Sequence, residues 1–181
     1  MQIISRHLTN VLLLKPNQII TDECFTTNGD KNELNHVLKK NIQFVQDNFL
    51  KSYKNVLRGL HYQIQYPQGK LVRVISGLVF DVVVDLRKNS NTFGQSATFN
   101  LNSEDGLSLW IPPGFAHGFY VISDYADIFY SVTEYRHQEF ERILLWSDPE
   151  LNINWPLLNL TPNLSEKDQG GKLLLNSEIY I

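Results

Sequence analysis

The amino-acid sequence predicts an all-β fold: a double-sheet jelly roll, in the form of a sandwich or barrel, with a few short helices, mainly C-terminal. Runs rich in β-branched and aromatic residues recur at close spacing along most of the chain. Clusters of Gly, Pro, Asn and Asp separate these runs, as turns require. The run from Leu78 to Leu86 is almost continuously apolar but carries Asp81 and Asp85. Such a run is typical of a strand covered on both faces, or of one that lines a polar cavity.

The N-terminal part of the chain is expected to contain two short strands, at Val11 to Leu14 and at Gln18 to Thr21. Residues Glu33 to Lys40 form the one plausible helix before mid-chain, because three apolar side chains at helical spacing fall on one face.

From residue 41 onward, strands and turns alternate. The predicted strands are Asn41 to Asn48, Val56 to Gln63, Lys70 to Ser76, Leu78 to Leu86, Ser96 to Leu101, Ser108 to Ile111, Gly118 to Ile122 and Ile128 to Glu134. After Trp155 the sequence turns polar, and we expect it to fold back as short helices or loops. No repeat or linker is visible, so we expect a single domain over residues 1 to 181.

Charge and cysteine content limit the classes of function. The 16 basic and 19 acidic residues give a net charge of -3, with no basic excess for nucleic acid or a membrane surface, so the expected partner is a small molecule. The N-terminus lacks a signal-peptide pattern and no stretch approaches the roughly 20 apolar residues of a membrane span, which favours a cytoplasmic protein. The single cysteine, Cys24, excludes an internal disulfide and a thiolate zinc cluster.

Two runs of sequence carry candidate catalytic side chains. In Arg-Gly-Leu-His-Tyr-Gln, His61 lies among strand-forming neighbours, and Lys70 begins an alternating strand nine residues later. A base and a cation directed into one cavity would be a catalytic arrangement. In Ile-Pro-Pro-Gly-Phe-Ala-His-Gly, two prolines and two glycines predict a tight turn that presents His117 reproducibly. The alternative for His117 is a turn histidine that bonds a backbone carbonyl.

Several longer motifs follow one another in order along the chain. They are FVQDN (44–48), VLRGLHYQ (56–63), PQGKLVRVISG (67–77), VFDVVVDLR (79–87), TFG (92–94), LWIPPGFAHGF (109–119), ER (141–142), WSDPELNINWP (146–156) and LSEKD (164–168). With these motifs the chain resembles the dTDP-4-dehydrorhamnose 3,5-epimerase family of the cupin superfamily. Each motif alone is weak, and their collinear order makes the resemblance specific.

The resemblance implies a cupin fold and an isomerase that inverts C3 and C5 of a nucleoside-diphosphate-linked 4-keto sugar, without a cofactor, for surface polysaccharide synthesis. Protons at C3 and C5 are acidic because the carbanion is delocalised onto the C4 oxygen as an enolate. Inversion needs a base on one face, a donor for the oxyanion and an acid on the opposite face.

The catalytic roles follow the resemblance residue by residue. His61 is the natural base, since an imidazole titrates near neutral pH. By resemblance Asp168 is its partner, Lys70 holds the C4 oxygen, and Tyr130 is the acid, with Tyr135 as the alternative. The family usually has a lysine directly after this tyrosine, where the chain has a serine.

The residues expected to bind substrate match family positions near the sugar, the diphosphate or the base. They are Arg58, His117, Gln46, Asn48, Phe25, Tyr135 and Lys167. The family's arginine upstream of Phe25 is missing from Thr21 to Thr26, which leaves the nucleotide open between dTDP and GDP and the sugar between a hexose and a heptose. Epimerisation at C3 alone and a non-catalytic sugar-binding module also remain open.

The sequence also bears on metal binding and on oligomeric state. Many cupins bind a metal through His-x-His, but here the corresponding pair is His61-x-Gln63, so we expect a metal-free site. His7, His36 and His137 are expected to be ordinary surface or loop residues. The resemblance implies a homodimer.

Overall fold

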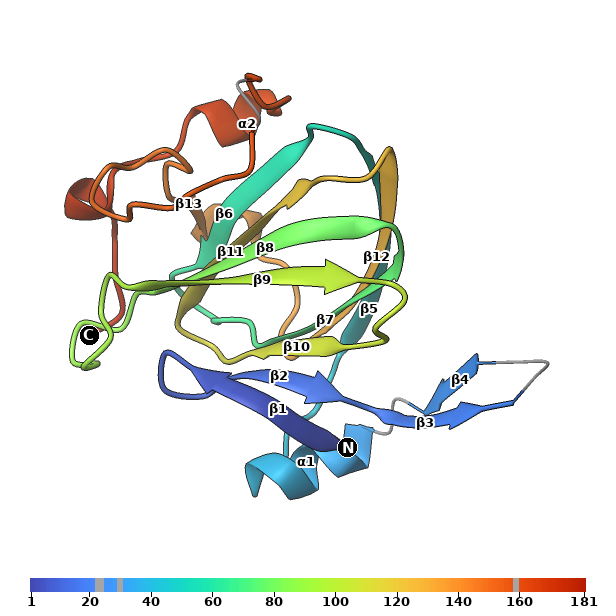
Figure 1. The fold of residues 1–181 in the computed structure, drawn as a ribbon. Coiled ribbons are helices and arrows are strands. Elements are labelled where there is room, and N and C mark those ends of the chain that lie inside the picture. The colour runs from blue at the N-terminus through green and yellow to red at the C-terminus, as the bar shows by residue number, and fades with distance from the viewer. Residues whose placement is uncertain (22–24, 29–30, 158–159) are drawn as a thin grey trace.

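Two antiparallel sheets make up most of the molecule (Figure 1). The computed structural model describes residues 1–21, 25–28, 31–157 and 160–181, with residues 18–20, 25–28 and 31 described by their backbone alone. The six-stranded sheet has the order β1 (Gln2–His7), β2 (Val11–Lys15), β10 (Ser108–Ile111), β7 (Lys70–Ser76), β12 (Tyr125–Val132), β5 (Gln46–Tyr53). The five-stranded sheet has the order β13 (Glu141–Ile143), β6 (Leu57–Gln63), β11 (Phe115–Val121), β8 (Leu78–Asp85), β9 (Ser96–Asn102). The predicted all-β, double-sheet fold is therefore confirmed.

The main core lies between the two sheets. Side chains alternate along each strand, so Val72 and Ile128 of one sheet face Val83 and Val121 of the other, and all four are almost fully buried. Each such aliphatic side chain contributes about 1.5–3 kcal/mol relative to an exposed position.

Strand β8 is buried on both of its faces, which explains its almost continuous apolar sequence. Val79 and Val83 face the core between the sheets, whereas Val82 and Val84 pack against Leu144 and other residues of a second cluster. Asp81 and Asp85 are also fully buried. Of the two alternatives expected for this run, the strand covered on both faces is confirmed.

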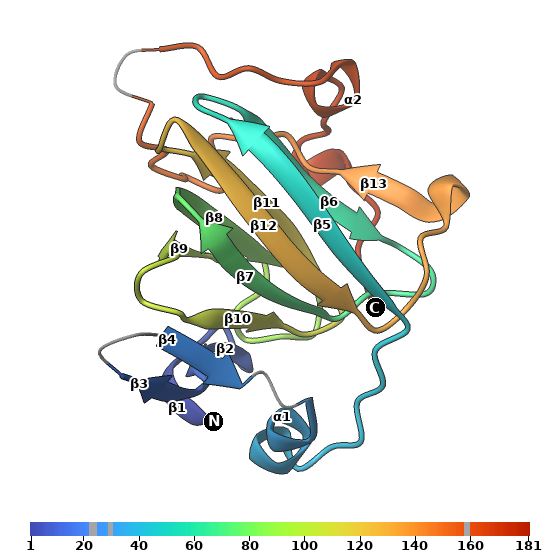
Figure 2. The same ribbon diagram turned by 90° about the vertical axis from the view of Figure 1, so that its right-hand side faces the viewer.

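Helix α1 (Lys31–Leu38) packs on the outer face of the six-stranded sheet, to which β1 and β2 belong. The helix packs Leu34 against Leu12 and Trp110, and Figure 2 shows it below this sheet. Strands β3 (Asn17–Ile20) and β4 (Phe25–Asn28) pair only with each other and extend away from the two sheets (Figure 1).

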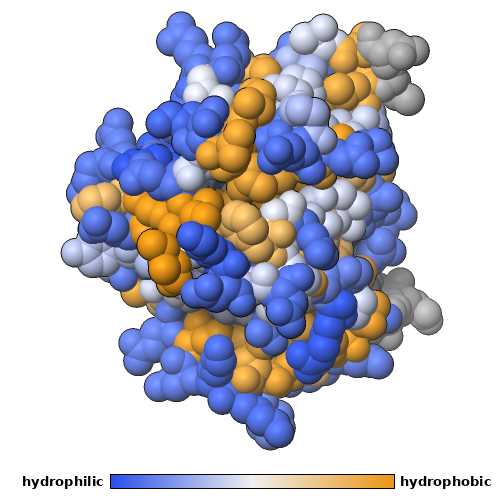
Figure 3. Space-filling view, turned by 90° about the vertical axis from the view of Figure 1, so that its left-hand side faces the viewer, coloured by the Kyte–Doolittle hydropathy of each residue, from blue (hydrophilic) through white to orange (hydrophobic). Residues whose placement is uncertain are grey.

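The C-terminal segment covers the five-stranded sheet and contains the short helices α2 (Glu166–Gln169) and η2 (Leu174–Asn176), as the sequence predicted; η1 (Gln138–Phe140) precedes β13. Figure 3 shows the side of the molecule on which the C-terminus lies, where apolar patches alternate with hydrophilic surface. Leu175 and Ile181 of this segment are largely exposed. Among the described residues, no helix is long and apolar enough to cross a membrane.

Two predicted strand positions were wrong. The predicted strand Asn41 to Asn48 is instead β5 at Gln46–Tyr53, because Ile42 and Phe44 pack beside Trp110 under the sheet and do not pair in it. Strand β11 begins at Phe115 and not at Gly118, since Phe115 already pairs with Asp85 of β8. Strands β1, β4 and β13 were not predicted.

Candidate active site

A cavity of about 120 Å³ lies between the two sheets and gathers four of the residues expected at the site. Arg58 and His61 reach it from β6, His117 from β11 and Tyr130 from β12. The other lining residues are Leu50, Val72, Gly118, Phe119 and Ile128. The cavity therefore combines an apolar wall with two imidazoles, a phenol and a guanidinium.

His61 forms a short hydrogen bond with Asp168, 107 positions further along the chain. The distance from His61 Nε2 to Asp168 Oδ1 is 2.5 Å, and the Asp168 side chain is 2% exposed. Burial lowers the pKa of His61 and outweighs the opposing effect of the carboxylate. The imidazole is therefore neutral at pH 7 and able to accept a proton.

The N-terminus of α2 fixes the Asp168 carboxylate. Ser165 caps this helix: its Oγ accepts from the Asp168 backbone N–H at 3.2 Å and donates to Asp168 Oδ2 at 2.7 Å. The Gly59 N–H donates to Oδ1 at 3.4 Å. Burial pulls the pKa of Asp168 upward, but the hydrogen bonds from His61 and Ser165 hold it below its ordinary value. The carboxylate is therefore ionised and can stabilise an imidazolium.

Lys70 lies at the start of β7, close enough that its charge lowers the pKa of His61. Burial lowers the pKa of Lys70 itself to about 8, while Asp81 and Glu141 oppose that change. The ammonium form still predominates at neutral pH, which is the form that can donate to an oxyanion.

A second histidine–aspartate pair lies beside the first. His117 pairs with His61 across β11 and β6, and its Nε2 is 2.9 Å from Oδ2 of the fully buried Asp81. His117 is thus a strand residue bonded to a carboxylate, which corrects the expected turn position and the carbonyl-bonded alternative. Asp81 was not among the predicted site residues, although an acid inside an apolar run was the signal. Its Oδ1 has no hydrogen-bond partner among the described residues.

Tyr130 and Tyr135 occupy different environments. Tyr130 lines the cavity from the six-stranded sheet, and burial raises the pKa of its phenol, so it carries its proton at neutral pH. Tyr135 follows the strand, is 55% exposed and does not line the cavity. Ser131, which replaces the family's usual lysine, is buried and donates to Asp47 of β5.

Three of the other expected binding residues, Gln46, Asn48 and Lys167, do not line the cavity. Gln46 donates to Asn48 at 2.6 Å on β5, and Asn48 pairs with Tyr130 in the sheet. Lys167 donates to Glu141 at 2.8 Å. Phe25 lies on β4, but its side chain is outside the described part of the chain, as is Cys24.

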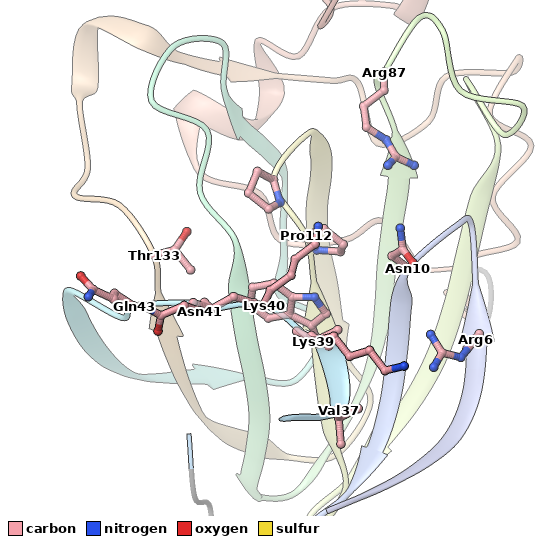
Figure 4. Close-up of a pocket in the computed structure, with 14 residues that line it drawn as sticks. Arg6, Asn10, Val37, Lys39, Lys40, Asn41, Gln43, Arg87, Pro112 and Thr133 are labelled. Atoms are coloured by element: carbon pink, nitrogen blue, oxygen red, sulfur yellow. The ribbon is translucent and has the colours of Figure 1, made fainter. Parts of the chain in front are cut away.

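A larger cavity of about 890 Å³ lies elsewhere, between the end of α1, the β1–β2 turn and the β10–β11 turn. Arg6, Lys39 and Arg87 lie around it (Figure 4), and none of the expected site residues lines it. In the described part of the chain, no group of three or more His, Cys, Asp or Glu side chains could hold a metal ion.

Comparison with known proteins identifies the family. The family model described as dTDP-4-dehydrorhamnose 3,5-epimerase matches residues 5–176. The chain belongs to this family. A relative of that name from Pseudomonas aeruginosa is 52% identical over 139 residues, 77% of this chain and 76% of the relative. Another from Shigella flexneri is 44% identical over 184 residues and covers all of both chains.

Solved structures of epimerases agree with this family assignment. The dTDP-6-deoxy-D-glucose-3,5-epimerase of Legionella pneumophila, crystallised with dTDP-4-keto-L-rhamnose, superposes with a TM-score of 0.93 at 43% identity and covers 98% of this chain and 94% of that one. The enzyme from Elizabethkingia anophelis gives 0.92 at 34% identity, with 98% of each chain covered. The predicted family, the isomerase class and the double-sheet fold are confirmed.

Proposed function

We propose that this enzyme inverts C3 and C5 of dTDP-4-keto-6-deoxyglucose, for the synthesis of a surface polysaccharide sugar, and works as one domain. The observation that carries the proposal is the His61–Asp168 pair facing Tyr130 across one small cavity. The Legionella relative's bound dTDP-4-keto-L-rhamnose supports the choice of dTDP and of the sugar.

The mechanism uses each group in the protonation state that its surroundings favour. Neutral His61 removes the proton from C3 or C5, and Asp168 stabilises the imidazolium. The ammonium of Lys70 donates to the C4 oxygen as the enolate forms. Tyr130 returns a proton to the same carbon from the opposite face. The tyrosinate then regains a proton and the imidazolium loses one to solvent, so the net change is an isomerisation.

The nucleotide is proposed to lie outside the small cavity, because about 120 Å³ leaves no room for it beside a sugar. Arg58 can make bidentate contacts with the pyrophosphate. The remaining proposed contacts are His117, Gln46, Asn48, Phe25, Tyr135 and Lys167.

We also propose that two copies pack through the outer face of the six-stranded sheet. Four large side chains project from that face with 43–66% exposure: Phe49, Tyr53, Ile75 and Tyr125. We call them the outer patch. Phe49 and Tyr53 pair with Phe129 and Tyr125 in the sheet, and the ion pair Lys51–Asp127 lies between these two pairs, so the patch spans β5 and β12. A self-complementary surface of this kind suits a two-fold dimer.

Deuterium uptake tests the proposed reaction. The enzyme is incubated in D₂O with dTDP-4-keto-6-deoxyglucose, and exchange at C3 and C5 is followed by proton NMR, with a GDP-linked 4-keto sugar in parallel. We expect exchange at both carbons with the dTDP sugar and a loss of about 10²- to 10⁴-fold in His61→Asn. Exchange at C3 alone would identify a 3-epimerase, and exchange only with the GDP sugar would correct the nucleotide. No exchange with either would favour a binding module.

A further inference from the structure

Glu141, at the start of β13, holds two cationic side chains, and the three residues line a separate cavity of about 380 Å³. The Glu141 carboxylate accepts from Arg136 through Nε at 2.9 Å and Nη2 at 2.8 Å, and from Lys167 at 2.8 Å. The Glu141 side chain is only 17% exposed, whereas Arg136 is 60% and Lys167 42% exposed. The Glu141 carboxylate is thus the buried member of a three-residue cluster, and the two cations lie on its solvent side. We call Glu141, Arg136 and Lys167 the clamp.

The clamp joins the two segments that adjoin the proposed base and the proposed acid. Lys167 directly precedes Asp168 in α2, and Arg136 directly follows Tyr135 after the strand that carries Tyr130. Strand β13 itself pairs with β6, with Ile143 opposite His61. The Glu141 carboxylate therefore links the segment that follows β12 to helix α2.

Gln63, opposite Glu141 in the β6–β13 pair, holds the same segment through its backbone. Its amide nitrogen donates to the carbonyls of Tyr66 at 2.8 Å and Tyr135 at 3.2 Å, and its oxygen accepts from the His137 N–H at 2.7 Å. The side chain is 4% exposed and uses both kinds of polar atom. The segment after β12 is thus fixed at its backbone by Gln63 and at its side chain by Glu141.

The charge of Glu141 also acts on Lys70. Burial and Lys167 lower the pKa of Lys70, whereas Asp81 on β8 and Glu141 on β13 raise it. The charge of Lys70 in turn lowers the pKa of His61 on β6. Although burial opposes ionisation of Glu141, its hydrogen bonds to Arg136 and Lys167 lower its pKa to about 2. The carboxylate is negative throughout the working pH range.

We propose that Glu141 is a positioning residue of the epimerase, which holds Arg136 and the proposed substrate contact Lys167 in place and sets a negative charge near Lys70. The inference rests on the proposed function and adds to it a residue outside the catalytic set. Loss of the charge weakens two charge-assisted contacts, so we expect kcat/KM to fall about tenfold.

The test compares Glu141→Gln with Glu178→Gln across pH 6 to 9.5, with kcat, KM and exchange at C3 and C5 as readouts. Glu178 lines the same cavity of about 380 Å³ but pairs with Arg142 instead of with Arg136 or Lys167, and it is therefore the matched control. In Glu141→Gln the alkaline limb of the rate should move to lower pH by about half a unit or more, because Lys70 loses a neighbouring negative charge. Glu178→Gln should match the wild type in every readout.

The variant Glu141→Asp distinguishes the effect of the carboxylate's charge from the effect of side-chain length. The shorter carboxylate keeps the wild-type alkaline limb but lowers kcat/KM, because it spans the two cations less well. The inference is overturned if Glu141→Gln retains the wild-type kcat, KM and pH profile, or if Glu141→Asp shifts the alkaline limb as the glutamine does. If Glu141→Gln does not fold, the limb of Glu141→Asp decides. Absence of exchange in the wild type would instead overturn the proposed function.

Discussion

At the scale of single residues, the proposed reaction depends on two protonation states that hold together only in a limited pH range. His61 must be neutral, so the rate falls as pH drops through its pKa, which lies below 6.5. Lys70 must be charged, so the rate falls as pH rises through about 8. We expect a bell-shaped profile of kcat/KM for the free enzyme, with its maximum between these limits.

Lys70→Arg provides the check on this profile. A guanidinium stays charged at every accessible pH, so the variant should lose the alkaline limb near pH 8 while it keeps the acidic one. The measurement is kcat/KM from pH 5 to 10. If the alkaline limb is unchanged in this variant, the fall in kcat/KM near pH 8 arises from another titratable group.

Replacement of Tyr130 by Phe separates proton removal from inversion. The base and the oxyanion donor are untouched, so exchange of substrate protons with solvent should persist within a few-fold of the wild type. Formation of the inverted sugar should fall by about 10²-fold or more, because no acid remains on the opposite face. NMR in D₂O reports both quantities. Equal loss of exchange and inversion would contradict the role, and Tyr135→Phe is the matched comparison.

The sequence allowed prediction of the site residues that lie in motifs, but not of all their partners. His61 and Lys70 stand in two neighbouring strand-forming motifs, so their chemistry could be inferred locally. The Asp168 pairing came only from family resemblance, since its contact with His61 spans 107 positions and depends on how the C-terminal segment docks. Asp81 was missed as a site residue because an acid in an apolar strand does not reveal which histidine it faces.

At the scale of elements, the close approach of β6 and β11 sets the separation of the two histidines. A Cβ added at Gly118 would lie 2.5 Å from the Arg58 carbonyl oxygen and 3.1 Å from Gly59 Cα. These contacts are backbone atoms of the neighbouring strand, which cannot move aside as a flexible side chain can. Only glycine fits the strand at this point.

Gly118→Ala should therefore push the two strands apart. We expect a loss of about 1–3 kcal/mol of stability and a lowered melting temperature, together with a fall in kcat, since His61 and His117 lie on either side of the contact. Thermal unfolding and the exchange assay measure the two effects. Gly170→Ala is the control, because a Cβ there meets only Lys167 O at 3.5 Å. Equal melting temperatures of the two variants would contradict this explanation of the close approach between β6 and β11.

Strand positions were predictable where the apolar pattern reflects pairing within a sheet. Strand β7 was predicted to the residue because its side chains alternate between two environments. The segment 41–45 has the same alternation, but Ile42 and Phe44 pack, partly buried, against the cluster that contains Leu34 of α1 and Trp110. Strand β13 has only three residues, and its pairing with β6 is a tertiary contact that no local pattern specifies.

At the scale of the whole molecule, the outer patch predicts association. Phe49→Glu combined with Ile75→Glu places two charges on the proposed two-fold contact, and we expect the wild type to sediment as a dimer and this variant as a monomer. Leu175→Glu, at an 81% exposed position in the C-terminal segment, is the control and should remain dimeric. Sedimentation velocity distinguishes these outcomes, and a dimeric double variant would exclude this face.

The docking of α2 also has a consequence for the order of events during synthesis. Chains emerge from the ribosome N-terminus first, and both sheets are complete at Ile143, before Asp168 has been added. The nascent barrel already contains His61, Lys70 and Tyr130 but lacks the carboxylate that orients the base. A nascent chain halted before α2 should therefore fold its strands and yet remain almost inactive, so that catalytic competence requires translation through α2.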